Sequence, residues 1–185
     1  MDEPELGYLG VPGTVRPIVQ VGDPVLSTPC ATVTSFDDDL VQLLADMFAS
    51  MYAADGVGLA ANQIGVGVQV FVYDCPDDAQ RFHRGVMINA TLLEPTTRYL
   101  DEDEEGCLSV KGQFAELARP DFAMVRGVDH AGNPIEVSGD GLLARCLQHE
   151  YDHLQGMLFI DRLSARKRKK VLKGWEADQA ALLAE

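Results

Sequence analysis

Two histidines and a glutamate lie together in the segment QHEYDHLQG at residues 148–156. If this segment is a helix, the four-residue spacing of His149 and His153 separates their side chains by about 40° around the axis and about 6 Å along it. One metal ion can therefore bind both imidazoles. Glu150 is turned by about 100° from His149, so its carboxylate lies beside the ion without becoming a ligand. That position suits a general base that faces a metal-bound water.

The same spacing also occurs by chance, and the two histidines can equally be satisfied residues of a core or a surface. A catalytic metal ion needs at least a third protein ligand and one open position. No histidine follows His153, which leaves Asp161 and Glu176 as downstream candidates. The other histidines, His83 and His130, lie in segments predicted to be loops, and we expect both to be solvated.

An upstream candidate for the third ligand is Cys107, which follows an acidic run in the segment DEDEEGCLSVKG. The glycine before it leaves room for the backbone to approach a metal ion, and a thiolate bound to a cation stays ionised without a separate base. The alternative is a small cysteine buried in the core, a common place for a free cysteine. The four cysteines include no C-x-x-C pair, so neither a disulfide framework nor a zinc ribbon is expected.

A glycine-rich segment, GVGLAANQIG at residues 56–65, carries the amide side chain of Gln63. Glycine-rich turns by themselves mostly reverse the chain. An amide donor in such a loop can, however, stabilise an oxyanion. Gln63 is therefore a candidate for that role.

The composition is that of a soluble globular protein, with 46% hydrophobic and 24% charged residues. A length of 185 residues fits one domain with a core and a recessed site. No apolar run approaches the roughly twenty residues of a membrane span, and the N-terminal segment lacks the basic and apolar regions of a secretory signal. We therefore expect a cytoplasmic protein without membrane contact.

The formal net charge of −14 is spread unevenly. Residues 161–185 hold seven Lys or Arg and four acidic residues, which leaves the rest of the chain strongly acidic. Such a body is repelled by nucleic acid, so DNA is not an expected partner, and any anionic partner must approach the C-terminal tail. The alternative is that the basic residues form an ordinary solvated helix face.

Helices are predicted on both sides of a strand-rich middle. Ser35 or Asp37 is expected to cap a helix that ends before Gly56, because apolar residues recur within it at helical spacing. Short β-branched and aromatic runs without regular strand–helix alternation favour an α+β fold. The predicted strands cover residues 69–74, 85–89, 92–100, 123–128 and 135–138, and the later helices cover 140–154 and much of 164–184.

Taken together, the segments GVGLAANQ, EGCLS and QHEYDHLQG resemble the three signature motifs of peptide deformylase, in that family's order and at similar separations. The resemblance implies an α+β fold, with antiparallel β-sheets packed around a central metal-binding helix and with flanking N-terminal and C-terminal helices. The expected organisation is a flexible arm at residues 1–15, a catalytic domain at 16–163 and a basic C-terminal helix at 164–185.

The resemblance also implies an activity, which is removal of the formyl group from the N-terminal formyl-methionine of newly synthesised polypeptides, with release of formate. Glu150 then acts as acid and base, while Gln63 and the backbone N–H of Leu108 are the oxyanion donors. Water is the fourth ligand of an ion that is commonly Fe(II) in this family, with Zn or Ni able to occupy the site. The implied metal ligands are Cys107, His149 and His153.

Apolar side chains are expected to flank this site. Leu142 and Cys146 share the helix face of the two histidines, and with Val57 they can form a pocket for the unbranched thioether of methionine. The alternative is that Leu142 and Cys146 are plain core, because such periodicity marks any buried face. The expected substrate-binding residues are Gly56, Val57, Gly58, Leu142, Arg145 and Cys146.

Three supporting contacts are expected as well, and of these only the pairing of Asp152 with Arg119 follows from the resemblance. Glu105 is expected to orient a metal-binding imidazole, as carboxylates often do. Asp152 is expected to pair with Arg119 and fix the metal-binding helix. Arg145 occupies the ligand-bearing helix face where some relatives have apolar residues, and it is predicted to lie near the pocket mouth and to touch the peptide.

Two residues depart from the family pattern. Many relatives have proline where this chain has Asn62 and Lys111. Neither residue is expected to supply a chemical group, so the departures concern loop rigidity and subfamily.

Two other functions compete with the deformylase interpretation. An H-E-x-x-H metallopeptidase would use the same water and base without Cys107 and would cleave internal peptide bonds. A metal-stabilised binding module without turnover would have no use for Glu150. Independently of these, the tail segment ARKRKKVLKGW at residues 165–175 is a candidate contact for ribosomal RNA through counterion release.

Overall fold

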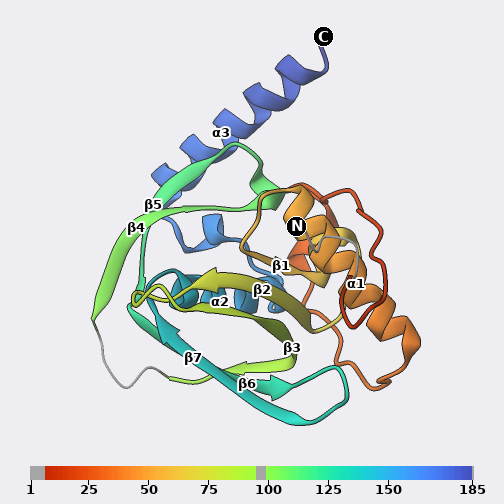
Figure 1. The fold of residues 1–185 in the computed structure, drawn as a ribbon. Coiled ribbons are helices and arrows are strands. Elements are labelled where there is room, and N and C mark those ends of the chain that lie inside the picture. Colours follow the sequence, from red (N-terminus) through yellow and green to blue (C-terminus); the bar gives the residue numbers. More distant parts are fainter. Residues whose placement is uncertain (1–6, 95–98, 185) are drawn as a thin grey trace.

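The computed structural model describes residues 7–94 and 99–184. Helices flank a strand-rich middle, as the α+β prediction requires (Figure 1). The α-helices are α1 (Asp38–Ala53), α2 (Gly141–Leu154) and α3 (Ala165–Leu182). The strands are β1 (Gly58–Ala60), β2 (Val70–Pro76), β3 (Phe82–Leu92), β4 (Leu100–Gly106), β5 (Phe114–Pro120), β6 (Phe122–Val128) and β7 (Pro134–Asp140). Short 3₁₀ turns cover Pro24–Ser27, Ala61–Ile64, Leu108–Val110 and Phe159–Arg162.

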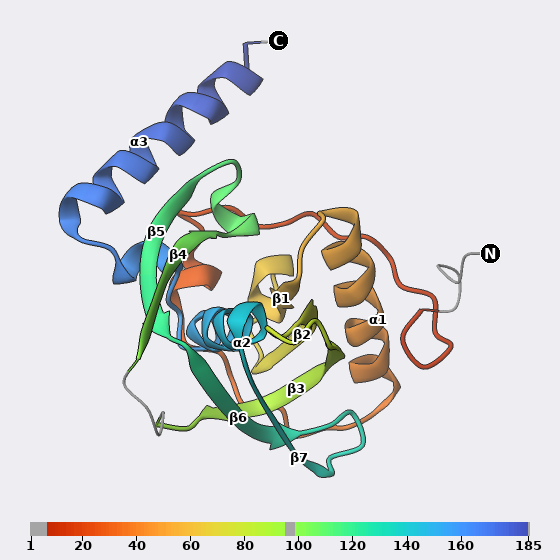
Figure 2. The ribbon, with the colours of Figure 1, turned by 60° about the vertical axis from the view of Figure 1, so that its left-hand side comes forward.

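One antiparallel sheet has the strand order β1-β2-β3-β6-β7. Successive side chains of a strand point to opposite faces of the sheet. Val70 and Val72 of β2 belong to the core cluster of Met47 on α1. Phe71, between them, belongs to the cluster of Leu147 on α2. The sheet therefore separates the two helices, and Figure 2 shows α2 in the middle of the molecule, with strands around it.

The start of α1 agrees with the capping signal in the sequence. The Asp37 side chain accepts a hydrogen bond from the N–H of Leu40, which satisfies one of the free donors of the first turn. Asp38 and Asp39 add negative charge where the helix dipole favours it. Because α1 ends at Ala53, the chain passes directly into the glycine-rich segment of β1.

A second sheet consists of β4 and β5, and no local pattern in the sequence predicts these two strands. Every residue of β4 from Leu100 to Glu104 is exposed, so the strand lacks the alternation on which strand prediction depends. The strand expected at residues 92–100 is wrong in its described part, because β3 ends where that range begins and β4 starts where it ends. Residues 95–98 of that range lie outside the described residues.

Helix α2 runs where the sequence predicts it and is buried along most of its length. The chain leaves it through Gly156, whose φ of 74° is the left-handed conformation that glycine adopts freely. A Cβ at this position would also lie 2.8 Å from the backbone carbon of Thr28. The end of α2 is therefore fixed against the N-terminal segment.

The first described residues and the last helix both pack on the body. The Tyr8 ring stacks on Phe48 of α1 with ring centroids 5.2 Å apart, and the N–H of Thr14 donates to Asp46 at 2.9 Å. Val171 of α3 is buried in a third core cluster, which also contains Cys107. The division into arm, catalytic domain and basic helix stays a prediction, and residues 1–6 of the arm lie outside the described residues. None of the helices in the described part of the chain combines the length and apolar character that a membrane span requires.

Candidate metal centre

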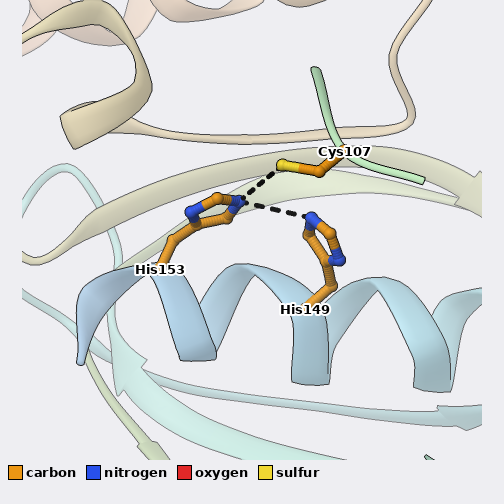
Figure 3. A group of neighbouring side chains, drawn as sticks. All are labelled: Cys107, His149 and His153. Carbon is orange, nitrogen blue, oxygen red and sulfur yellow. Dashed lines mark hydrogen bonds between the residues drawn. The ribbon is translucent and has the colours of Figure 1, made fainter. Parts of the chain in front are cut away.

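Three donor atoms from two separate elements converge (Figure 3). His149 and His153 project from the same face of α2, and their Nε2 atoms lie 3.2 Å apart. Cys107 directly follows β4, and its Sγ lies 3.4 Å from Nε2 of His153. All three donor atoms lie within 4.8 Å of one another. The structure thus brings together the residues that the sequence singles out as ligands.

The donor set fits a transition-metal ion. A thiol and two imidazoles suit Zn and Fe, whereas Mg and Ca prefer oxygen ligands. Burial lowers the pKa of His153 well below its ordinary value, so its ring is neutral and has a free lone pair for a cation. The downstream alternatives are engaged or distant, since Asp161 accepts from the N–H of Leu158 and pairs with Arg168, while Glu176 is exposed on α3.

A buried carboxylate holds the imidazole of His149, as expected. Oε1 of Glu105 accepts a hydrogen bond from Nδ1 of His149 at 2.7 Å, which turns Nε2 toward Cys107 and His153. Although burial alone would raise it, hydrogen bonds from Arg119 and His149 hold the pKa of Glu105 well below its usual range. Glu105 is therefore ionised when it orients the ring.

The expected pair of Arg119 and Asp152 is also present, within a larger network. Nη1 of Arg119 lies 3.0 Å from Oδ2 of Asp152, and Nη2 lies 2.6 Å from Oε1 of Glu105. Arg162 also binds Asp152, with Nη2 2.6 Å from Oδ1. These contacts join β4, β5, α2 and the segment before α3 around the metal-binding helix. The sequence gives no local signal for Arg162, because its partner is ten positions away and on another element.

Glu150 lies beside the donor atoms, where the helix geometry predicts it. Its side chain is buried, and Oε2 has no hydrogen-bond partner among the described residues. Burial raises the pKa of Glu150 to about 7, a value that suits proton transfer near neutral pH. Gly58 makes the space for this carboxylate, because a Cβ there would lie 2.5 Å from Oε1 of Glu150 and 2.7 Å from Sγ of Cys146.

Gln63 is held next to Cys107 by the 3₁₀ turn that follows β1. Its Oε1 accepts a hydrogen bond from the N–H of Ala60 at 2.9 Å, which fixes the orientation of the amide. Nε2 then donates to Oγ of Ser109 at 3.2 Å and to Sγ of Cys107 at 3.6 Å. The amide donor therefore points into the group of residues that the sequence predicts to act together.

A cavity of about 910 Å³ opens over this group. Its volume is within the range of small-molecule sites. Val57 and Leu142 are partly exposed at its edge, whereas Cys146 is buried. The cavity is lined by all six residues that the resemblance implies for substrate binding and by Gln63, Cys107, Leu108, His149 and Glu150.

The comparison with protein families agrees with this geometry. The model of the polypeptide deformylase family matches residues 15–169. The chain belongs to the peptide deformylase family. Peptide deformylase 1 of Streptomyces avermitilis is 58% identical over 163 residues, which cover 87% of this chain and 76% of that protein. Peptide deformylase 2 of Streptomyces coelicolor is 51% identical over 164 residues, covering 89% of this chain and 91% of that one.

Solved structures of peptide deformylases have the same fold. The enzyme from Legionella pneumophila superposes with a TM-score of 0.84 at 37% identity, covering 93% of this chain and 99% of the other. The enzyme from Ehrlichia chaffeensis in complex with actinonin gives a TM-score of 0.83 at 35% identity, covering 89% and 98%. The predicted α+β fold around a central metal-binding helix is confirmed.

Peptide deformylases are metal-dependent hydrolases that remove the N-terminal formyl group from nascent peptides, and this chain is one of them. The deformylase prediction is therefore confirmed. The competing interpretations, an internal metallopeptidase and a binding module without turnover, are set aside by the same match.

The position of Arg145 in this deformylase differs from the prediction that it lies at the mouth of the pocket. Arg145 lines the cavity, but its guanidinium is buried. Nη1 lies 3.0 Å from Oε2 of Glu105, and Nη2 lies 3.1 Å from Oδ2 of Asp101. A contact with the peptide stays a prediction, and Arg145 is at the same time part of the network that holds Glu105.

Asn62 supplies a chemical group, contrary to expectation. It is fully buried, and its Nδ2 donates to the backbone carbonyl of His153 at 2.8 Å. This carbonyl belongs to the last turn of α2, where the regular helical pattern ends, and it also accepts a hydrogen bond from the N–H of Gly156 at 3.1 Å. The expectation was wrong because a buried amide so close to a predicted loop has no local signature. The side chain of Lys111 is exposed, and its backbone N–H donates to Gln20.

The two remaining histidines are less solvated than expected, and only His130 lies in a loop. His83 lies on β3, and its Nε2 is 3.0 Å from Oδ2 of the buried Asp77. His130 is half-buried, and its Nδ1 lies 3.1 Å from the hydroxyl of Tyr8. The loop prediction is therefore wrong for His83 and right for His130, whose partner Tyr8 lies 122 positions away in the sequence.

Proposed function

We propose that Cys107, His149 and His153 hold one divalent metal ion, which is Fe(II) in the cell and can be replaced by Zn or Ni. The observation that carries this assignment is the convergence of Sγ and two Nε2 atoms beside the buried carboxylate of Glu150. Sulfur and imidazole nitrogen together favour these ions over Mg and Ca. A catalytic ion held by these three residues would keep one coordination position for water or substrate.

Glu150 is the acid and base of the reaction. What a bound ion supplies here is Lewis-acid polarisation of the formyl carbonyl and a lowered pKa of water. The Glu150 carboxylate accepts the proton of the attacking water and then donates it to the departing amine nitrogen. A pKa raised by burial keeps the carboxyl close to the pH at which both transfers are efficient.

The negative charge that develops on the formyl oxygen is met by hydrogen-bond donors of the chain. We assign this role to Nε2 of Gln63 and the backbone N–H of Leu108. Both residues line the cavity, and Gln63 is already oriented by Ala60. Donors fixed before the reaction lower the barrier because they need no reorganisation as charge develops.

The formyl-methionine side chain occupies the apolar part of the cavity. Val57, Leu142 and Cys146 supply its walls, and the glycines at 56 and 58 let the peptide approach β1. An unbranched thioether fills such a pocket flexibly. The substrates are N-formylmethionyl polypeptides.

The basic residues of α3 are a candidate contact for ribosomal RNA, because new polypeptides emerge at the ribosome. Synthesis of those substrates places the enzyme in the cytoplasm. Lys169 and Lys170 are exposed, so Lys169→Glu with Lys170→Glu changes the charge without disturbing the core. Cosedimentation with ribosomes should weaken in this variant and in higher salt. Binding that is indifferent to both changes contradicts the contact.

The decisive experiment replaces Glu150 by glutamine. The variant retains the metal ligands, so its metal content should equal that of wild type. Formate release from formyl-Met-Ala should fall by about 10² to 10⁴-fold, the usual contribution of a positioned acid or base. Glu176→Gln, an exposed change on α3, serves as control. Turnover at the wild-type rate in metal-loaded Glu150→Gln would remove Glu150 from the mechanism.

A further inference from the structure

We propose that Gln20 is a positioning residue that couples α3 to the turn carrying the Leu108 N–H. This inference rests on the proposed oxyanion role of that N–H. The turn covers residues 107–113, between the end of β4 and the start of β5, so no ladder of the two-stranded sheet holds it. Its geometry must be set by contacts from other parts of the chain.

The N-terminal segment supplies the first of these contacts. Nε2 of Gln20 donates to the carbonyl of Leu108 at 3.0 Å, and Oε1 accepts from the backbone N–H of Lys111 at 3.3 Å. Between them, the N–H of Val21 donates to the carbonyl of Ser109 at 2.8 Å. One amide side chain and one backbone N–H therefore clamp both ends of the 3₁₀ turn.

Helix α3 contacts the same amide side chain of Gln20. Nε1 of Trp175 donates to Oε1 of Gln20 at 3.3 Å, while Nε2 of Gln20 also donates to the carbonyl of Ile18 at 3.3 Å. A glutamine amide has two donor hydrogens and two acceptor lone pairs. All four are used here, so the amide has no alternative orientation that preserves its bonds. The indole of α3 thereby fixes the group that holds Leu108.

A second contact between α3 and the same turn supports the proposed coupling. Nε2 of Gln113 donates to Oδ2 of Asp178 at 2.6 Å. Gly174 lies inside the helix, where glycine is disfavoured, yet a Cβ there would be 2.2 Å from Oε1 of Gln113. The glycine thus allows the helix to lie close against the side chain of the turn.

Helix α3 also forms part of the cavity wall. Gln179 and Leu182, near its C-terminal end, line the same cavity as Leu108 and Glu150. Figure 2 shows this helix running beyond the β4–β5 sheet toward the C-terminus. The family match ends at residue 169, so Trp175 and the other contacting residues of α3 lie outside it. The basic helix is therefore part of the catalytic unit of this chain rather than a separate appendage.

The coupling should appear in kcat more than in KM. Interactions with the developing oxyanion are stronger in the transition state than in the bound substrate, so a displaced donor mainly slows the chemical step. Trp175→Phe removes the indole N–H and keeps an aromatic ring. Gln20→Glu keeps acceptors for Trp175 and Lys111 but loses the donor to Leu108.

The test measures three quantities on Zn-loaded or Ni-loaded enzyme, which are kcat and KM for formyl-Met-Ala and backbone hydrogen exchange in residues 107–113. In both variants kcat should fall about three- to tenfold, as expected for one lost hydrogen bond. KM should stay within about twofold, because ground-state binding is not the interaction removed. Exchange in the turn should accelerate, while Lys173→Ala, an exposed change on the same helix, should alter none of the three quantities.

The outcomes separate the inference from the function on which it rests. Wild-type exchange in residues 107–113 of both variants overturns the positioning role of Gln20, whatever happens to kcat. Faster exchange with unchanged kcat overturns the oxyanion role of the Leu108 N–H instead. A double variant whose kcat is the product of the two single effects contradicts a shared path, because residues that act through one contact are not additive.

Discussion

Nδ1 of His149 donates a hydrogen bond to Oε1 of Glu105, and the 2.7 Å contact decides which ring nitrogen faces the metal site. Arg119 binds the same carboxylate at 2.6 Å. The imidazole is therefore oriented by an anion that is itself fixed by a buried guanidinium. Metal affinity should depend on this chain of contacts as well as on the ligands.

Glu105→Gln should weaken metal binding by about 10- to 100-fold, the usual cost of losing the partner of a metal-binding imidazole. The neutral amide retains the shape of the side chain but holds the ring less strongly. Competition with a chelator measures the affinity, and circular dichroism checks the fold. Glu102→Gln on exposed β4 is the control. Equal affinities in wild type and Glu105→Gln would contradict the orienting role.

Asn62→Ala should lower the free energy of unfolding by about 0.5 to 1.5 kcal/mol, because the buried carbonyl of His153 loses its amide donor and keeps the hydrogen bond from the N–H of Gly156. Urea unfolding of the metal-loaded protein measures the change. Asn62→Asp provides a comparison of similar size that lacks the donor, and it should be at least as unstable. A stability equal to that of wild type in both variants would show that the contact contributes nothing.

Arg145→Ala should alter the ratio of kcat/KM between formyl-Met peptides that differ in their second residue, if its predicted contact with the peptide exists. The same change should destabilise the protein, because it leaves the buried Glu105 carboxylate with fewer partners. Kinetics on several peptides and thermal unfolding report the two effects separately. An unchanged ratio with reduced stability would assign Arg145 to the network alone.

Asp77→Asn should reduce stability at neutral pH and matter less in acid. The backbone N–H of Arg81 and the imidazole of His83 hold the pKa of Asp77 well below its usual range. A carboxyl with a depressed folded-state pKa stabilises the protein above its unfolded pKa of about 3.9, and this contribution is lost as the pH falls toward the lower folded value. Urea unfolding at pH 7 and at successive pH values below about 4 should show the gap to wild type narrowing. A gap that widens in acid contradicts the assignment.

Local signals in the sequence predict the elements that carry them. The cap at Asp37, the periodicity of α1 and the spacing of His149 and His153 are each contained within a few residues, and the structure agrees with them. The sequence does not predict β4 and β5, because β4 consists mainly of exposed charged residues. Its extended conformation is stabilised mainly by pairing with β5. A strand of this kind exists through a non-local partner, which a window of sequence does not contain.

Local signals in the sequence likewise predict only part of the candidate site. The two histidines and Glu150 share one helix, so their geometry follows from the helical repeat. Cys107 and Gln63 come from other elements, and only the resemblance to a known family places them beside α2. The hydrogen bonds of Gln20, Asn62 and Arg162 join segments that are far apart in the sequence or lie on different elements. No local sequence motif predicts these bonds.

The bare backbone of Gly58 has a consequence for how this enzyme can diversify. Oε1 of Glu150 and Sγ of Cys146 occupy the space that even a methyl group would need. A side chain at this position would displace the carboxylate of Glu150, so we expect substitutions of Gly58 to be poorly tolerated although the glycine performs no chemistry. Libraries aimed at new peptide preferences have to leave that codon untouched or vary position 146 together with it.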